Sequence, residues 1–122
     1  MFCKKYANFM KLIDKSITKT ELTQMADAMF GNLVKAVVDV DKEIMVVDAE
    51  LHSDEEAFLL ESGSKQENLW GINLYPDNSL SEFIEFDSMI NLRPSQGNTT
   101  RSVDDEGVRD KITLVIRKLV KW

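Results

Sequence analysis

The chain has 122 residues, of which 43% are apolar, and its formal net charge is −6. This length is typical of one domain, and the apolar content is sufficient for a hydrophobic core that needs no disulfide or structural metal. The acidic balance argues against a nucleic-acid partner, because affinity for nucleic acids comes largely from lysines and arginines that neutralise phosphates.

Composition also bears on the compartment and on the domain boundaries. No apolar run approaches the roughly 20 residues that cross a bilayer, and the first ten residues lack the apolar core of a signal peptide. We therefore expect no membrane partner. Cys3 is the single cysteine and cannot form an intrachain disulfide, which indicates a reducing, cytoplasmic compartment. We expect residues 1–9 to be an extension and residues 10–122 to form one domain.

The first elements expected in this domain are a short strand at 10–14 and a helix at 18–31. Thr18 and Glu21 match a capping box, in which the two side chains satisfy free N–H groups at a helix start. Apolar residues follow at helical spacing: Leu22, Met25, Ala26, Met29 and Phe30. Gly31 is placed to end the helix, because glycine readily adopts the left-handed conformation found there.

A β-hairpin is predicted next, with strands at 33–40 and 43–49 joined by a tight turn at residues 41–42. The register that follows pairs apolar residues on both faces: Val38 with Met45, Ala36 with Val47, and Val37 with Val46. Apolar pairs on both faces indicate a central hairpin that is covered at least partly on each side.

A short helix is predicted at 53–61. Ser53 and Glu56 offer a second capping box, and Gly63 is placed to end the helix. Because the apolar residues 57–60 are contiguous, a strand is the alternative for this segment. Two further strands are expected at 69–75 and 83–92, and they would form a hairpin around residues 76–82.

The last elements are a polar loop at 93–101 and a helix at 103–121, with Ser102 or Asp104 as its cap. One apolar stripe runs along this helix: Val108, Ile112, Val115, Ile116 and Leu119. The elements together predict a single α+β domain. Its sheet would be mainly antiparallel with four or five strands, and two principal helices, 18–31 and 103–121, would pack on it.

The single histidine, His52, is the first candidate site residue, and carboxylates surround it. If the preceding strand continues through residue 54, Glu50, His52 and Asp54 share one face and could bind a divalent metal. If a helix starts near Ser53 instead, the carboxylates are explained by the helix dipole, and we favour this structural interpretation. No other cofactor is expected. His52 and Glu50 are also the catalytic candidates, because hydrolase-type acid–base chemistry would have to use the single histidine.

The loop from Asn91 to Arg101 is the second candidate site. Its ligand-binding candidates are Arg93, Gln96, Asn98 and Arg101. Arginine makes bidentate contacts to carboxylate or phosphate groups, and the amides add further donors. The alternative is that these arginines pair with nearby carboxylates of the chain: Glu85, Asp87 or Asp104.

We further predict that the two polar segments form one concave site, with Glu50 and His52 opposite Arg93 and Asn98. Such a site would suit a zwitterionic or phosphorylated small molecule. The alternative is a direct pair between Glu50 and Arg93 or Arg101, which would only tie the loop to the strand.

Five motifs carry a resemblance to a known family: residues 34–39 (VKAVVD), 49–52 (AELH), 63–66 (GSKQ), 69–71 (LWG) and 90–94 (INLRP). Over residues 10–121 the chain resembles a small prokaryotic family of unknown function, and this resemblance implies no activity or cofactor. No complete catalytic motif is present. We therefore expect a soluble intracellular domain that binds a small molecule or a protein partner, and self-association is compatible with this. The alternative is a small metal-dependent or His-based acid–base enzyme of hydrolase type.

Overall fold

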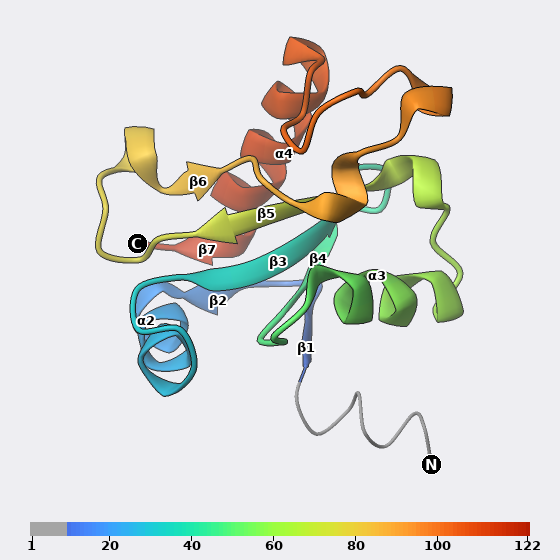
Figure 1. Ribbon diagram of the computed structural model, residues 1–122. Coiled ribbons are helices and arrows are strands. Elements are labelled where there is room, and N and C mark those ends of the chain that lie inside the picture. The colour runs from blue at the N-terminus through green and yellow to red at the C-terminus, as the bar shows by residue number, and fades with distance from the viewer. Residues whose placement is uncertain (1–9) are drawn as a thin grey trace.

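The structure, a computed structural model, describes residues 10–122, and these form one α+β domain (Figure 1). The expected extension at residues 1–9, with Cys3, lies outside the described residues. The main sheet has five strands in the order β1-β4-β3-β5-β6. In chain order these strands are β1 (Lys11–Ile13), β3 (Val34–Asp39), β4 (Ile44–Val47), β5 (Leu69–Leu74) and β6 (Ile84–Glu85). All neighbouring strands in this sheet are antiparallel, which confirms the predicted fold class.

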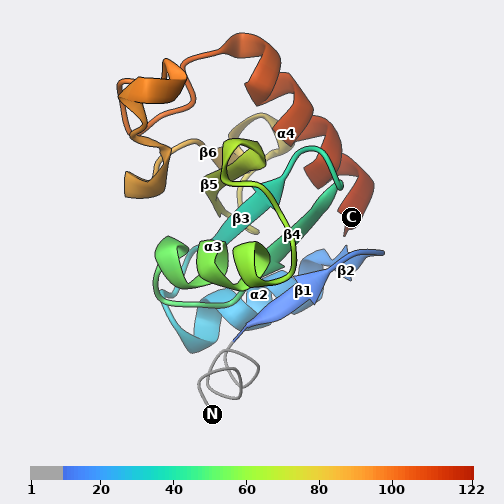
Figure 2. The same cartoon turned by 90° about the vertical axis from the view of Figure 1, so that its right-hand side faces the viewer.

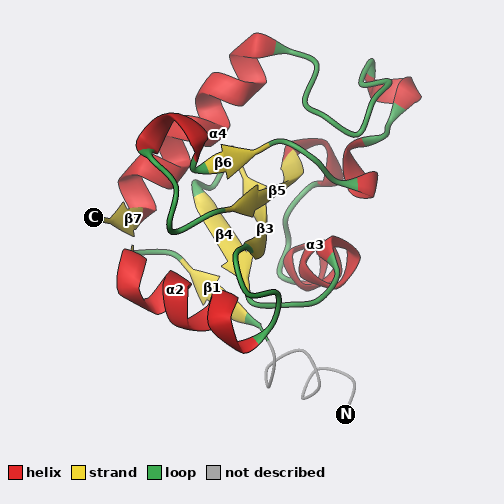
Figure 3. Ribbon diagram, turned by 60° about the vertical axis from the view of Figure 1, so that its left-hand side comes forward, coloured by secondary structure: helices red, strands yellow, loops and turns green. Residues whose placement is uncertain are grey.

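Helices cover both faces of this sheet. The α-helices among the described residues are α2 (Lys19–Ala28), α3 (His52–Glu61) and α4 (Glu106–Leu119). α2 and α4 lie on one face and α3 on the other (Figures 2 and 3). Val38 of β3 packs in one cluster with Leu22 of α2 and Ile112 of α4. Its neighbour Val37 packs with Leu59 of α3. Successive side chains of a strand point to opposite faces, so the central strands contribute to two cores.

A second, two-stranded sheet was not predicted. β2 (Ile17–Thr18) pairs in parallel with β7 (Val120–Lys121), and this pairing joins the segment before α2 to the end of α4. Four 3₁₀ turns complete the described elements: η1 (Gln66–Asn68), η2 (Leu80–Glu82), η3 (Met89–Asn91) and η4 (Pro94–Gln96). Within residues 10–122, none of the helices has the length and apolar character needed to cross a membrane.

The capping box of α2 and the register of the hairpin are confirmed. Thr18 accepts the N–H of Glu21, whose carboxylate accepts the N–H of Thr18. The observed pairs in the hairpin include Ala36–Val47, Val37–Val46 and Val38–Met45. The predicted two-residue turn is wrong, because residues 40–43 form a longer turn. Asp39 stabilises it by accepting two backbone N–H groups of the turn through one carboxylate oxygen.

The predicted start of α3 is wrong. The helix begins at His52, no side chain caps it, and the predicted capping box of Ser53 and Glu56 is not formed. Glu55 turns into the protein instead and accepts the N–H of Ala49. The helix start is therefore fixed by a buried contact to the preceding connection, which no local capping pattern reveals.

The predicted caps of α4 are also wrong. Asp105 caps this helix by accepting the N–H of Gly107, rather than Ser102 or Asp104. Asp104 belongs to the preceding loop, where its carboxylate accepts the N–H of Thr99. The apolar stripe is confirmed, with four of its residues buried: Ile112, Val115, Ile116 and Leu119.

The strand predicted at 83–92 is wrong over most of its length, because β6 covers only Ile84–Glu85. The chain then leaves the sheet edge and passes over β5, where Ser88 lies against Gly71. A Cβ at position 71 would lie 2.6 Å from the Cβ of Ser88, so glycine is required for this close approach. From residue 86 to residue 105 the chain forms an irregular loop that contains η3 and η4, which we call loop 86–105.

Candidate functional site

The segment that holds the histidine leaves β4 at Val47 and enters α3 at His52. Between them Asp48 has a φ of 75°, a left-handed conformation that turns the chain away from the strand direction. Glu50, His52 and Asp54 therefore do not share a strand face, so the arrangement on which the metal prediction depended is not formed. Within the described part of the chain, no group of three or more His, Cys, Asp or Glu side chains is placed to hold a metal ion.

His52 is buried, and its Nε2 lies 2.7 Å from the carbonyl oxygen of Ile72. Because a carbonyl can only accept, Nε2 carries the proton, and the second ring nitrogen, Nδ1, is unprotonated in the neutral ring. Burial lowers the pKa of His52 to about 4, against the opposing effect of the Ile72 hydrogen bond. An imidazole with this pKa is a weak proton acceptor at neutral pH, since catalytic bases work best with a pKa near the operating pH. The geometry of His52 thus favours a structural role.

Glu55, three residues after His52, is the most deeply buried ionisable side chain of the described residues. One carboxylate oxygen accepts the N–H of Ala49 at 3.1 Å, and the other has no partner within the described residues. Burial raises the pKa of Glu55 well above its usual value. Burial therefore favours the protonated carboxyl group, and the sequence pattern of Glu55 among other carboxylates gave no sign of this.

We expect Glu55→Gln to become more stable than the wild type as the pH rises above 4.5. The unfolded chain releases the Glu55 proton near pH 4.5, whereas the folded protein retains it, so this group's contribution to stability is lost as pH rises. The amide keeps an acceptor for Ala49 and does not titrate. Urea unfolding at a series of pH values should show the advantage of the variant growing above pH 4.5 by up to about 1.4 kcal/mol per pH unit. A constant difference across this range would contradict the assignment.

A polar row crosses the sheet on the α3 side. Lys35 of β3, Asn73 of β5 and Glu85 of β6 occupy paired positions on the three strands. Asn73 donates to a carboxylate oxygen of Glu85 at 2.9 Å, and the Tyr75 hydroxyl donates to the same oxygen at 2.8 Å. Burial, with the bond to Glu85 second, raises the pKa of Tyr75 to about 12. The carbonyl oxygen of the Asn73 side chain is buried without a partner in the described residues.

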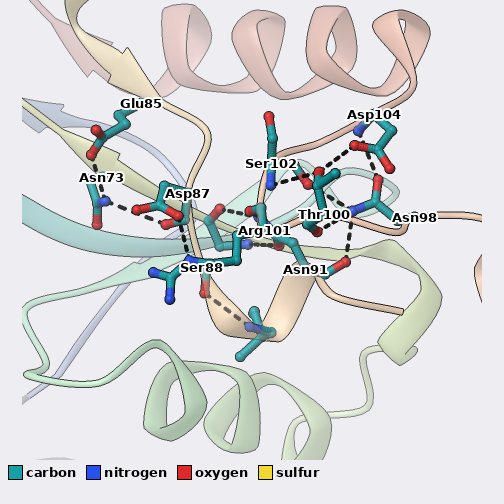
Figure 4. A network of polar contacts seen from close by, with 12 residues as sticks. Asn73, Glu85, Asp87, Ser88, Asn91, Asn98, Thr100, Arg101, Ser102 and Asp104 are labelled. Carbon is teal, nitrogen blue, oxygen red and sulfur yellow. Dashed lines mark hydrogen bonds and ion pairs between the residues drawn. The ribbon is translucent and has the colours of Figure 1, made fainter. Parts of the chain in front are cut away.

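The predicted pairing of a loop arginine with a carboxylate is found at Arg101. Its Nε donates to Asp87 at 2.7 Å, and both side chains are largely exposed (Figure 4). The charge of Asp87 raises the pKa of His52 and the charge of Arg101 lowers it, after the larger effects of burial, the Ile72 hydrogen bond and Lys35. Loop 86–105 contacts α3 through η3.

Arg93 is committed to backbone carbonyls of the protein. Its guanidinium donates to Ile90 at 2.8 Å, to Gln66 at 2.8 Å and to Leu69, and it lies over the ring of Trp70 with 4.5 Å from Cζ to the ring centroid. These contacts tie the loop to the start of β5. They also leave Arg93 poorly placed for the anionic ligand that its sequence context suggested.

The two amides of the loop are engaged in the same way. Asn98 is buried, and its side-chain N–H groups donate to the carbonyls of Asn91, Thr100 and Ser102, while its oxygen accepts the N–H of Asp104 (Figure 4). In a separate contact, Gln96 donates to the Glu67 carbonyl at 2.9 Å. The structure thus uses Asn98 and Gln96 to hold the loop, and their role in binding a ligand stays a prediction.

Asn91 begins the candidate loop, but its structural role was not predicted. Its side chain accepts the N–H of Gly71 at 2.9 Å, donates to the carbonyl of Gly71 at 2.9 Å, and donates to the carbonyl of Arg101 at 3.0 Å. β6 pairs with β5 only at Asn73 and Leu74, so it does not reach Gly71. The Asn91 amide takes the place of a strand partner there. Because these partners are 20 and 10 residues away in sequence, no local motif indicates the contact.

Loop 86–105 also exposes two large apolar side chains. Met89 is 61% exposed and Leu92 is 43% exposed. They lie three residues apart at a 3₁₀ turn, where side chains at positions i and i+3 lie on the same side. Between them Ile90 packs beneath the turn against the cluster that includes Phe58 of α3. We call Met89 and Leu92 the apolar pair of the loop.

The single concave site, with Glu50 and His52 opposite Arg93 and Asn98, stays a prediction. Arg101, rather than Arg93, is the loop arginine whose charge reaches His52. Asn98 lies buried inside the loop. The alternative, a direct ion pair of Glu50 with either arginine, is not found within residues 10–122, because Arg101 pairs with Asp87.

Comparisons with known proteins identify a family, but they give no activity, substrate or partner. The model of the family described as "Protein of unknown function (DUF5674)" matches residues 11–119. No curated protein matches the chain, and no solved structure matches it.

Proposed function

The chain belongs to the DUF5674 family of proteins of unknown function, and from its geometry we propose that it is an intracellular protein-interaction module. Loop 86–105 is its recognition element, and the apolar pair makes the central contact with a partner protein. The single cysteine supports a reducing compartment.

One observation carries this proposal: an irregular loop is held rigid by internal hydrogen bonds while it exposes Met89 and Leu92. Loops longer than about 12–15 residues without regular structure are usually either functional or disordered. Here Asn91, Asn98 and Arg93 fix the loop through bonds to backbone carbonyls. A rigid loop loses little conformational entropy on binding, which favours affinity.

A protein partner fits this loop better than a small polar ligand does. The three nitrogens of the Arg93 guanidinium and the amide nitrogen of Asn98 already donate inside the protein, which leaves them less available to a phosphate or carboxylate. The apolar pair is exposed among polar side chains of the loop, and methionine adapts to varied protein surfaces. The enzyme alternative has less support, because the Nε2–H of His52 is held by a carbonyl and its pKa is about 4.

The test is selection of a displayed library of random peptides on the immobilised chain, followed by binding of the selected peptides to Met89→Ser/Leu92→Ser. We expect the double variant to weaken binding by about tenfold or more, as truncation of central interface residues does. Leu80→Ser is the control, because Leu80 is 58% exposed but lies in η2. Fluorescence anisotropy measures each affinity. Peptides that bind the double variant as well as the wild type, or a library that yields none, would refute the proposal.

A further inference from the structure

The outer face of α4 combines positive charge with one large apolar side chain. Lys111, Leu114, Arg117 and Lys118 recur at helical spacing on the side opposite the buried stripe, and we call them the α4 outer face. Leu114 is 66% exposed, the highest value among the large hydrophobic side chains of the described residues. The neighbours of Leu114 three and four residues away on the helix are these three cations and one carboxylate, Asp110, so the surface around it is mainly but not wholly cationic.

A hollow flanks this face on each side. One, of about 360 Å³, lies between α4 and the β3–β4 turn. Leu114, Val115 and Val40 contribute its apolar lining, and two lysines of α4 and two carboxylates of the turn, Asp41 and Glu43, contribute its charged lining. The other, of about 340 Å³, lies between α4 and the η2–β6 segment, where Phe83 and Ile116 contribute. These volumes lie near the lower end of the roughly 300–1,000 Å³ range of ligand pockets. An apolar side chain of a partner can therefore pack beside Leu114, in one of these hollows.

The charge on this face is opposite to that of the chain as a whole. α4 carries four cationic side chains against two carboxylates, although the formal net charge of the chain is −6. Lys118 pairs with Glu43 at 2.6 Å, whereas Lys111 and Arg117 form no ion pair within residues 10–122. Complementary charge favours an acidic partner. The acidic remainder of the chain repels an extended polyanion such as a nucleic acid, but a short acidic segment can be confined to the helix.

We propose that the α4 outer face binds a short acidic segment of a partner protein, which places an apolar side chain in a hollow beside Leu114. This site is separate from the apolar pair of loop 86–105. α4 packs on one face of the sheet, whereas η3 contacts α3 on the other (Figure 3). With both sites occupied, the protein would join two partners.

The experiment uses a fluorescein-labelled synthetic peptide in which glutamate pairs alternate with leucine pairs. Wild type binds this peptide, and binding weakens with added salt because the contact is partly electrostatic. Lys111→Glu/Arg117→Glu weakens binding by at least about tenfold, or about 1.4 kcal/mol. Leu114→Ser also weakens it. The matched control Lys15→Glu/Lys65→Glu makes the same charge change at exposed positions away from α4 and retains the affinity. Circular dichroism verifies the fold of each variant.

Several outcomes would overturn the inference. These are no binding to wild type, equal binding of a peptide with lysine in place of glutamate, and equal affinity for Lys111→Glu/Arg117→Glu. Displacement of the peptide by a short oligonucleotide or by phosphatidylglycerol vesicles would assign the face to a different polyanion. Met89→Ser/Leu92→Ser separates this inference from the proposed function, because it should bind the acidic peptide as wild type does. If it does not, the peptide occupies loop 86–105, and only the α4 site is rejected.

Discussion

Asn91→Ala is expected to lower the free energy of unfolding by about 4 kcal/mol, because it leaves several buried backbone groups without partners at a cost of roughly 1–3 kcal/mol each. The Asn91 side chain is fully buried and bonds to both the N–H and the carbonyl of Gly71, and to the carbonyl of Arg101. Alanine can replace none of these bonds, and the cavity that it leaves is too polar to collapse favourably. Urea unfolding of the wild type and the variant measures the difference.

Asn78→Ala is the matched control for this prediction. Asn78 is exposed, and its side chain makes one hydrogen bond, to the carbonyl of Glu82 at 3.2 Å. Water can replace that bond, so the control should change stability by less than about 1 kcal/mol. Similar effects of the two substitutions would show that Asn91 does not hold loop 86–105 to β5. Limited proteolysis gives a second measurement, since Asn91→Ala should speed cleavage within the loop.

His52→Gln is expected to remove an acid-dependent loss of stability of about 3 kcal/mol between pH 6.5 and pH 4. The folded protein keeps His52 neutral, with a pKa of about 4, whereas the unfolded chain takes up a proton near pH 6.5. The stabilising contribution is therefore complete above pH 6.5 and is lost as pH falls through 4. Glutamine can still donate to the carbonyl of Ile72 and does not titrate, so the variant should lack this part of the pH dependence.

Glu55 acts in the opposite direction over part of the same range, because its contribution is lost as pH rises above 4.5. Between pH 4.5 and 6.5 the two groups therefore change the free energy of unfolding in opposite directions. Their net effect on the wild type should be small in this range. Each single variant should expose the slope of the remaining group, and His52→Gln/Glu55→Gln should remove both. Comparing variants cancels the contributions of other carboxylates, such as Glu21 and Asp104, whose pKa values are lowered by hydrogen bonds. If His52→Gln follows wild type at every pH, His52 is not a buried neutral group.

The features that could be predicted from the sequence depend on neighbours a few residues apart. The capping box of Thr18 and Glu21 spans three residues, and the stripe on α4 repeats at the helical period. The hairpin register followed from a short connection that limits how the two strands can pair. Such patterns are visible because the chain itself sets the distance between the groups.

The α+β class, the central hairpin and the amphipathic helices α2 and α4 could therefore be predicted from local patterns, since hydrophobic periodicity selects which faces are buried. The partners of the polar side chains, in contrast, depend on contacts between segments that are distant in sequence. Arg93 bonds to carbonyls 24 and 27 residues away, Asn91 to Gly71, and Glu55 enters the core beside Ala49. A polar side chain near a strand end can face solvent, a ligand or a buried backbone group. Which one it meets depends on the segments that the fold brings beside it, because every buried donor and acceptor needs a partner.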